Sequence, residues 1–141
     1  MPARSTKSAV AATKPLDEKI TINIGFVDLG QIDLLVQEGF YANRTDMIRT
    51  AIRNQLTCHA EAVKQAVARK TLVLGIQHFS AADLGAVHKS KQTLQVRVLG
   101  LAVIAADVTP ELALATIESI VVLGALHASA PVKAALASRI R

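Results

Sequence analysis

The sequence predicts a mixed α/β protein in two parts. Residues 18–25, EKITINIG, alternate apolar and polar side chains as a strand does, and a helical pattern follows them up to residue 70 with no second strand. After residue 70, the triplet Val-Leu-Gly occurs three times at nearly equal spacing. Hydrophobic residues make up 51% of the chain and aromatic residues only 3%, so we expect a core of small aliphatic side chains.

Residues 1–17 predict a flexible basic arm. They are small and polar, contain two prolines and carry the positive charges of Arg4, Lys7 and Lys14. Such a segment buries too little apolar surface to order itself. It is either a disordered tail or an arm that adds contacts to phosphate groups.

The stretch 18–25 predicts a single strand. Ile20, Ile22 and Ile24 fall on one face, and Thr21 and Asn23 fall on the other. A lone strand leaves its backbone groups and its isoleucine row without partners. We therefore expect it to pair with the same strand of a second chain, which gives an intertwined homodimer joined by an intermolecular two-stranded β-ribbon.

Two helices follow the strand. Asp28 is the expected N-cap of the first helix, and Gly39 is its expected end. Asn43 or Thr45 caps the second helix, which carries an apolar stripe and is expected to run on to about Arg69. The domain expected from these elements covers residues 18–70.

Residues 71–141 predict a β-α repeat domain. Each Val-Leu-Gly triplet ends a β-branched apolar run, and a helix-start signal follows each run. The nearly continuous apolar character of the middle run is typical of parallel strands covered on both faces. The units form a short solenoid or a small open sheet, and their role is oligomerisation, signal reception or packing alone. The triplet glycines are Gly75, Gly100 and Gly124, and the helix-start signals are Ser80 with Asp83, Thr109 with Pro110, and Ser129 with Pro131.

Residues 18–57 resemble the ribbon-helix-helix (CopG/Arc/MetJ-type) family of DNA-binding proteins. The segments that carry the resemblance are EKITINIG, VDLGQIDLLVQEG and GFYANRTDMIRTAIRNQL. Asn43-Arg44-Thr45-Asp46 stands where the family commonly has Ser-Arg-Ser-Glu, and the run from Ile48 to Arg53 matches the family's helical run. Gly25-Phe26 departs from the Leu-Pro that the family often has at the end of the strand. The resemblance does not reach the C-terminal half.

The resemblance implies a way of binding double-stranded DNA, and the ribbon supplies its mechanism. A two-stranded ribbon fits the major groove of B-DNA, with its isoleucines facing the helices and its polar side chains facing the bases. Backbone amides at the start of the second helix are placed to bind a DNA phosphate. The alternative is that these residues do not contact DNA, and that the polar strand face and the helix start are exposed only to solvent. The expected base-contacting residues are Lys19, Thr21 and Asn23, and the expected phosphate-contacting residues are Asn43, Arg44 and Thr45.

Metal, cofactor and enzyme functions are not expected. Cys58 and His59 are adjacent and would point in different directions on a helix, and His78, His88 and His127 lack ligand spacing. No nucleophile elbow, P-loop or dinucleotide fingerprint occurs. We expect no catalytic residue, no metal and no cofactor.

A cytoplasmic location is expected. A single cysteine cannot form an internal disulfide, which fits a reducing compartment. The N-terminus has no apolar core of the signal-peptide type, and no apolar run approaches the about 18 residues that a membrane span needs.

The sequence thus predicts a sequence-specific DNA-binding transcriptional regulator, acting as a repressor. The net charge of +5 agrees with an anionic partner. The expected partners are double-stranded DNA and further copies of the chain, as a homodimer or as a tetramer or larger oligomer, and no membrane. One alternative is an antitoxin whose C-terminal half neutralises a toxin. The other is a structural protein that assembles through its C-terminal repeats.

Overall fold

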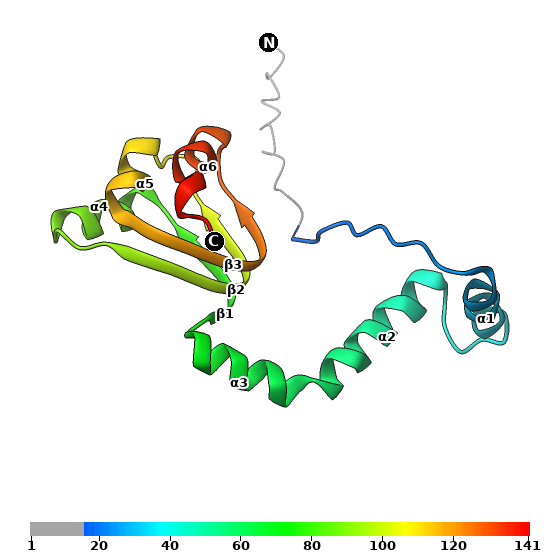
Figure 1. Cartoon of the computed structure of the whole chain (residues 1–141). Coiled ribbons are helices and arrows are strands. Elements are labelled where there is room, and N and C mark those ends of the chain that lie inside the picture. The colour runs from blue at the N-terminus through cyan, green and yellow to red at the C-terminus, as the bar shows by residue number, and fades with distance from the viewer. Residues whose placement is uncertain (1–15) are drawn as a thin grey trace, which may run out of the picture.

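The structure is a computed structural model that describes residues 16–141. The basic arm expected over residues 1–17 therefore lies almost wholly outside the described residues. Three helices come first, and three strands that alternate with three helices follow them (Figure 1). The first helices are α1 (Phe26–Gln37), α2 (Arg44–Cys58) and α3 (Ala60–Lys70). The later elements are β1 (Val73–Phe79), α4 (Ala81–Lys89), β2 (Leu94–Ile104), α5 (Pro110–Thr116), β3 (Ile117–His127), α6 (Ala130–Leu136) and the 3₁₀ turn η1 (Ala137–Arg139).

Helix α1 begins earlier than the sequence predicted. Gly25 is the N-cap residue and has no side chain with which to cap the helix, so the sequence carries no signal there. Asp28 lies in the first turn instead, where its negative charge is favourable near the helix N-terminus. The predicted end at Gly39 is confirmed. Gly39 has a φ of +84° just beyond the C-cap Glu38, a conformation that glycine adopts easily.

The region after the turn reaches Lys70 as expected, but as two helices. The break is at His59, whose backbone angles of φ −101° and ψ 9° are not helical. Near the end of α2, the Thr57 hydroxyl donates a hydrogen bond of 2.9 Å to the carbonyl oxygen of Arg53. Such back-bonding bends helices and gives a physical reason for the break. At the start of α2, Asn43 is the N-cap. This confirms one of the two predicted alternatives, Asn43 and Thr45.

Residues 18–25 are neither helix nor strand in the single chain, and Figure 1 shows them as an extended trace. The expected strand is absent there for a physical reason. A strand is defined by its ladder of hydrogen bonds, and residues 16–141 of one chain offer this segment no second strand. Pairing with a second chain stays a prediction at this point.

The C-terminal half is a three-stranded parallel sheet with the order β1-β2-β3. Each Val-Leu-Gly triplet lies in a strand, and the three triplets stand side by side in register. The helix-start signals are confirmed as N-caps. Ser80 forms a capping box with Asp83, Thr109 accepts from the amide of Leu112, and Ser129 caps α6.

The triplet glycines form a continuous row across the sheet. Gly75, Gly100 and Gly124 have φ values of +122°, +138° and +125°, which residues with a side chain rarely adopt. A Cβ atom on Gly100 would clash with the carbonyl oxygen of Gly75, and one on Gly124 would clash with the carbonyl oxygen of Gly100. Nothing lies within 4 Å of the corresponding position on Gly75. The row thus explains why glycine recurs in each unit.

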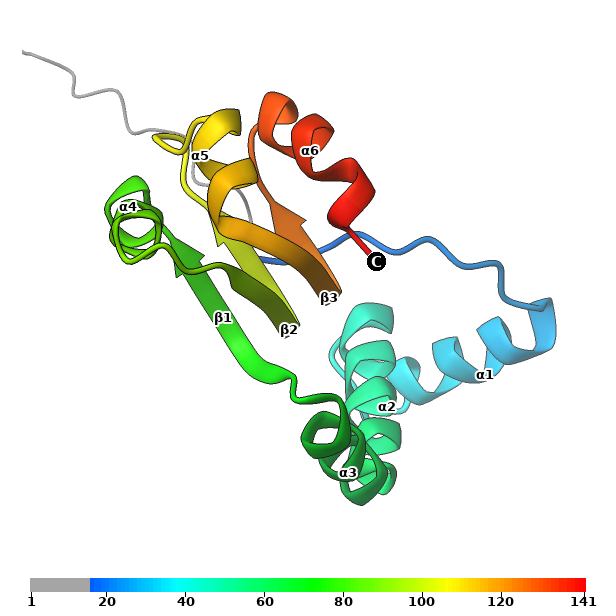
Figure 2. The same ribbon diagram turned by 60° about the vertical axis from the view of Figure 1, so that its left-hand side comes forward.

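The core lies between the sheet and helices α4, α5 and α6, which Figure 2 shows together on one face of the sheet. Side chains of the sheet and of these helices are fully buried there, as aliphatic residues of moderate size. Among them are Leu84, Val98, Ile117, Ile120, Val132 and Leu136.

The opposite face of the sheet, called here the open face, has no helix on it. Its side chains form three cross-strand rows, because alternate residues of a strand point to the same side. Leu74 and Leu123 are 72% and 49% exposed, and Ile76 is 57% exposed. The expectation that both faces are covered is therefore wrong for the single chain. The rows are Leu74, Leu99 and Leu123, then Ile76, Leu101 and Ala125, and last His78, Val103 and His127.

No helix in the described part of the chain combines the length and the apolar character that crossing a membrane requires.

Candidate nucleic-acid interface

The segment 18–25 presents both its polar and its apolar side chains to solvent. Lys19, Thr21 and Asn23 are exposed, as a surface that reads DNA requires. The alternating residues Ile20 and Ile22 are also exposed, by 80% and 63%. Because burying one aliphatic side chain is worth about 1.5–3 kcal/mol, this isoleucine row is an unsatisfied apolar surface in the single chain.

Helices α1, α2 and α3, which follow this segment, also bury almost no apolar side chains. Ile32 is the one buried residue among residues 16–72. Large apolar side chains of all three helices face solvent, and a contiguous exposed apolar surface marks a site of association. This half of the protein therefore lacks the buried surface that would hold it folded as a single chain. The most exposed of these side chains are Phe26, Val27, Leu34, Ile52, Leu56 and Val63.

The start of α2 is built to leave backbone amides free. The Asn43 side chain accepts a hydrogen bond of 2.8 Å from the amide of Asp46, and the Asp46 carboxylate accepts one of 3.0 Å from the amide of Ala42. The amides of Arg44 and Thr45 have no partner among residues 16–141. Free amides at the start of a 15-residue helix, together with the helix dipole, favour the binding of an anion at this end.

The Arg44 side chain is already engaged within the chain. Its Nε donates to Oδ1 of Asp33 at 2.7 Å, and its Nη2 donates to Oδ2 at 2.8 Å. These hydrogen bonds, and to a smaller extent the positive charge, lower the pKa of Asp33, and the same contact raises the pKa of Arg44. The pair ties the start of α2 to α1. Because both side chains are about half exposed, we assign it a role in orientation rather than in stability.

Asp33 was not among the site residues predicted from the sequence. It lies eleven residues before Arg44 on another helix, and no rule of local spacing links the two positions. Asn43, Arg44 and Thr45 do lie together at one helix start, as predicted. Lys19, Thr21 and Asn23 lie along one separate segment of the chain.

Comparison with families of known proteins matches residues 15–133 to the ribbon-helix-helix transcriptional regulator family. The chain belongs to this family. Ribbon-helix-helix regulators bind DNA and are usually dimeric. No curated protein and no solved structure matches the chain.

The match extends far beyond the segment that carried the resemblance in the sequence. It includes β1, β2 and β3 and reaches into α6, so the parallel sheet belongs to the pattern of this ribbon-helix-helix family. The resemblance confined to residues 18–57 was therefore too narrow. Residues 71–141 were predicted as a β-α repeat domain for oligomerisation, signal reception or packing alone, and no family resemblance was expected there.

The cysteine and histidines of this ribbon-helix-helix protein do not assemble a metal centre in the described range 16–141, where no three acidic, cysteine or histidine side chains come together. Cys58 is exposed and free, and His59 lies 3.2 Å from the side-chain nitrogen of Gln55. His78 and His127 lie on the open face instead. The expected absence of a metal and of a cofactor stays a prediction.

Proposed function

We propose that two chains pair residues 18–25 antiparallel into a β-ribbon that enters the DNA major groove. The observation that carries the proposal is the isoleucine row, which is exposed on a chain whose residues 16–72 bury only Ile32. Pairing gives the backbone of each segment its missing hydrogen bonds and turns both isoleucine rows onto the four helices α1 and α2 of the dimer.

The polar face of the ribbon reads the bases. Asn23 has the amide that pairs with N6 and N7 of adenine, and Thr21 offers a hydroxyl for hydrogen bonding and a methyl group for thymine. Lys19 reaches guanine or a phosphate. All three side chains are exposed on the single chain and have no competing partner among the described residues.

The start of α2 holds the dimer in register on the DNA backbone. The free amides of Arg44 and Thr45 bind a phosphate oxygen, and Asn43 shapes the turn by capping the helix. The Arg44 guanidinium stays with Asp33 and orients the two helices. Phosphate contacts of this kind position the protein, and the ribbon supplies the sequence preference.

Repression follows from occupancy, because a bound dimer excludes polymerase from the same DNA. Two dimers on adjacent half-sites bind the DNA more strongly than one dimer and so strengthen repression. Sedimentation that finds only one dimer on DNA with two half-sites would refute this binding of two dimers. The antitoxin alternative is less favoured. Its C-terminal half would be expected to fold on meeting a toxin, whereas α4–α6 and the sheet bury a core of their own.

The test is selection of binding sites from a random duplex library with three proteins. The wild type should enrich a palindromic or repeated site, and the variant Thr21→Ala with Asn23→Ala should lose it. The matched control is Gln92→Ala with Thr93→Ala, which removes the same kinds of side chain from an exposed turn before β2. The control should select the same site as the wild type.

The dimer is tested separately with Ile22→Lys, which places a charge in the isoleucine row. We expect this variant to lose both dimerisation through the ribbon and site selection. Enrichment of one site by all the proteins, including the Thr21 and Asn23 variant, would show that the ribbon does not read the bases. No enrichment by the wild type would leave residues 18–25 as a dimerisation strand only and favour a structural role.

A further inference from the structure

The first residues of β2 have a neighbouring strand on one side only. Pairing between β1 and β2 begins at Val73 and Val98, whereas pairing between β2 and β3 already begins at Leu94. Residues 94–97 therefore expose a backbone edge, called here the free edge, on the side away from β3. The residues that precede β1 do not fill this side, because they form the last turn of α3, which ends at Lys70.

The free edge presents backbone groups that a strand would pair. Alternate residues of a parallel strand direct their amide and their carbonyl group to the same neighbour, so part of the ladder is missing here. No amide of residues 94–97 donates to a turn or loop carbonyl within residues 16–141. An exposed strand edge of this kind is a template for pairing with another chain.

A hollow of about 510 Å³ lies along the free edge. The four edge residues form one wall, and Thr71 with side chains of β1 forms the other. Val73 is 45% exposed there, although it lies in a strand. Sites that bind an extended peptide combine these two parts, because the edge holds the main chain and a pocket receives alternate side chains. The lining side chains of β1 are Val73, Gln77 and Phe79.

The charges around the hollow are positive. Arg97 lines it and donates a hydrogen bond of 3.0 Å to the carbonyl oxygen of Lys70, and Lys91 lies three residues before the free edge. None of these three cations forms an ion pair with another residue of the described range 16–141. No lining residue is Asp or Glu. The carboxylate of Glu118 lies on the β3 side, where it accepts a hydrogen bond of 3.5 Å from Gln95.

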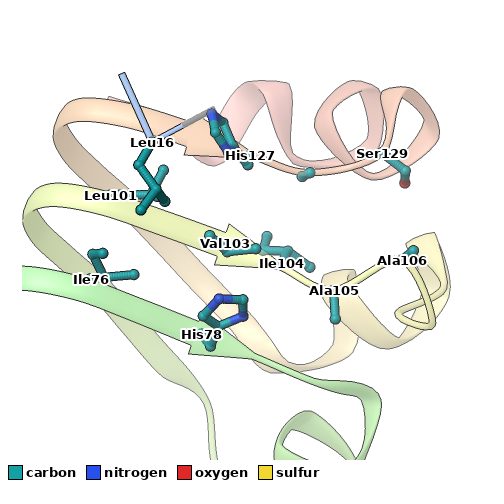
Figure 3. Close-up of a pocket in the computed structure, with 11 residues that line it drawn as sticks. Leu16, Ile76, His78, Leu101, Val103, Ile104, Ala105, Ala106, His127 and Ser129 are labelled. Carbon is teal, nitrogen blue, oxygen red and sulfur yellow. The ribbon is translucent and has the colours of Figure 1, made fainter. Parts of the chain in front are cut away.

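The other exposed parts of the sheet lack this combination. Figure 3 shows the hollow of about 490 Å³ on the open face, where Leu16 lies beside Leu101 and Val103 lies between His78 and His127. In that region β2 is paired with both β1 and β3, so its backbone is not free. The outer edge of β1 is free, but the strand Val73–Phe79 contains no Lys or Arg.

We propose that the free edge binds an extended acidic peptide of a partner protein, which adds to the sheet in line with β1. Backbone hydrogen bonds to residues 94–97 hold its main chain, and one of its apolar side chains enters the hollow against Val73 and Phe79. Its carboxylates lie near Lys70 and Lys91, and this complementarity favours acidic over basic sequences. The added strand needs no glycine, because it ends before the glycine row.

The experiment is selection of binding peptides by the full-length protein from a display library of short random peptides. We expect the enriched peptides to combine β-branched or aromatic residues with an excess of Asp and Glu. No enrichment by the wild type, or enrichment without an excess of acidic residues, would overturn the proposal.

Charge reversal then locates the binding surface. In fluorescence anisotropy, an enriched peptide should bind the variant Lys70→Glu with Lys91→Glu at least about tenfold more weakly than the wild type. The matched control is Lys64→Glu with Lys133→Glu, which reverses two exposed lysines outside the lining of the hollow. The control should bind the peptide more tightly than the Lys70 and Lys91 variant does. Equal affinity of the two variants would contradict the assignment of the surface.

N-methylation of the peptide tests strand addition without any change to the protein. Two versions of an enriched peptide carry N-methyl groups on alternate sets of amides, which removes those hydrogen-bond donors. Only one set of amides faces β2, so one version should bind at least about tenfold more weakly than the other. Equal binding of the two versions would show that the peptide does not join the sheet.

This inference and the proposed DNA binding fail separately. The Thr21→Ala, Asn23→Ala variant should lose DNA site selection and bind the peptide as the wild type does. Loss of peptide binding in this variant would assign the peptide to residues 18–25 and refute binding at the free edge.

Discussion

Replacing the glycines of the cross-sheet row with alanine should destabilise the C-terminal half in a graded order. All three glycines have positive φ values, so alanine is strained at each of them. At Gly100 the new Cβ atom would also clash with the carbonyl oxygen of Gly75. At Gly75 the same position is open. We expect Gly100→Ala to be clearly worse than Gly75→Ala.

The magnitudes follow from these two effects. Backbone strain at one residue costs about 1–3 kcal/mol of folding free energy, which is the whole expectation for Gly75→Ala. Forcing an extra methyl group into a packed site costs a further 1–3 kcal/mol or so, which makes about 2–6 kcal/mol for Gly100→Ala. The control is Gly85→Ala within α4, where φ is ordinary and nothing lies within 4 Å. It should raise stability by up to about 1 kcal/mol, because alanine is the better helix former.

The assay is thermal unfolding of the four proteins by circular dichroism at one protein concentration. For a domain of this size, each kcal/mol shifts Tm by about 4–8 °C. Gly100→Ala should therefore lower Tm by at least about 8 °C, Gly75→Ala should lower it less, and Gly85→Ala should not lower it. If Gly75→Ala lowered Tm as much as Gly100→Ala, the close approach of the strands would not be the reason for the glycine row.

Three further results are expected. Leu84→Ala should lower the free energy of unfolding by about 2–5 kcal/mol in a urea titration, since this side chain is fully buried; a loss below about 1 kcal/mol would contradict the assigned core. Hydrogen bonds from the Ser80 amide and hydroxyl lower the pKa of Asp83, so its contribution to stability should be present above the ordinary aspartate pKa of about 3.9 and lost as the pH falls through the lowered value. An NMR titration of Ser80→Ala should find the pKa of Asp83 raised only part of the way toward normal, because the amide of residue 80, which is the larger cause of the lowering, still donates its hydrogen bond. In the same way, Arg44→Gln should raise the lowered pKa of Asp33 to its ordinary range, and an unchanged pKa would show that the ion pair does not form in solution.

Local signals in the sequence predicted much of the fold. Ser80 and Thr109 were predicted as helix starts, and Asn43 as one of two candidates, because a cap is a contact between residues three positions apart. The three Val-Leu-Gly triplets predicted the alternation of strand and helix, because turn and cap chemistry repeats with them. The start of α1 was missed because its cap is a glycine, which leaves no side-chain signal.

The features that were missed depend on contacts distant in the sequence. The pair of Asp33 and Arg44 requires the angle between α1 and α2, which periodicity does not contain. Hydrophobic runs in β2 indicated that both faces of the sheet are covered, yet they cannot say whether the cover comes from the same chain. The pairing partner of residues 18–25 cannot be read from one sequence for the same reason, because the expected contacts are with another chain.

The glycine row also determines at which edge a further strand can be added to the sheet, and what that strand must contain. The clash that requires glycine runs one way, from each strand to the preceding one, so a new strand beside β3 would need a glycine aligned with Gly124. That edge is already partly occupied, since Ile140 pairs with Ile120 and the amide of Arg141 donates to the carbonyl oxygen of Ile120 at 2.9 Å. An engineered fourth unit must therefore replace the residues after α6, carry its own glycine, and keep any change of length outside the aligned triplets.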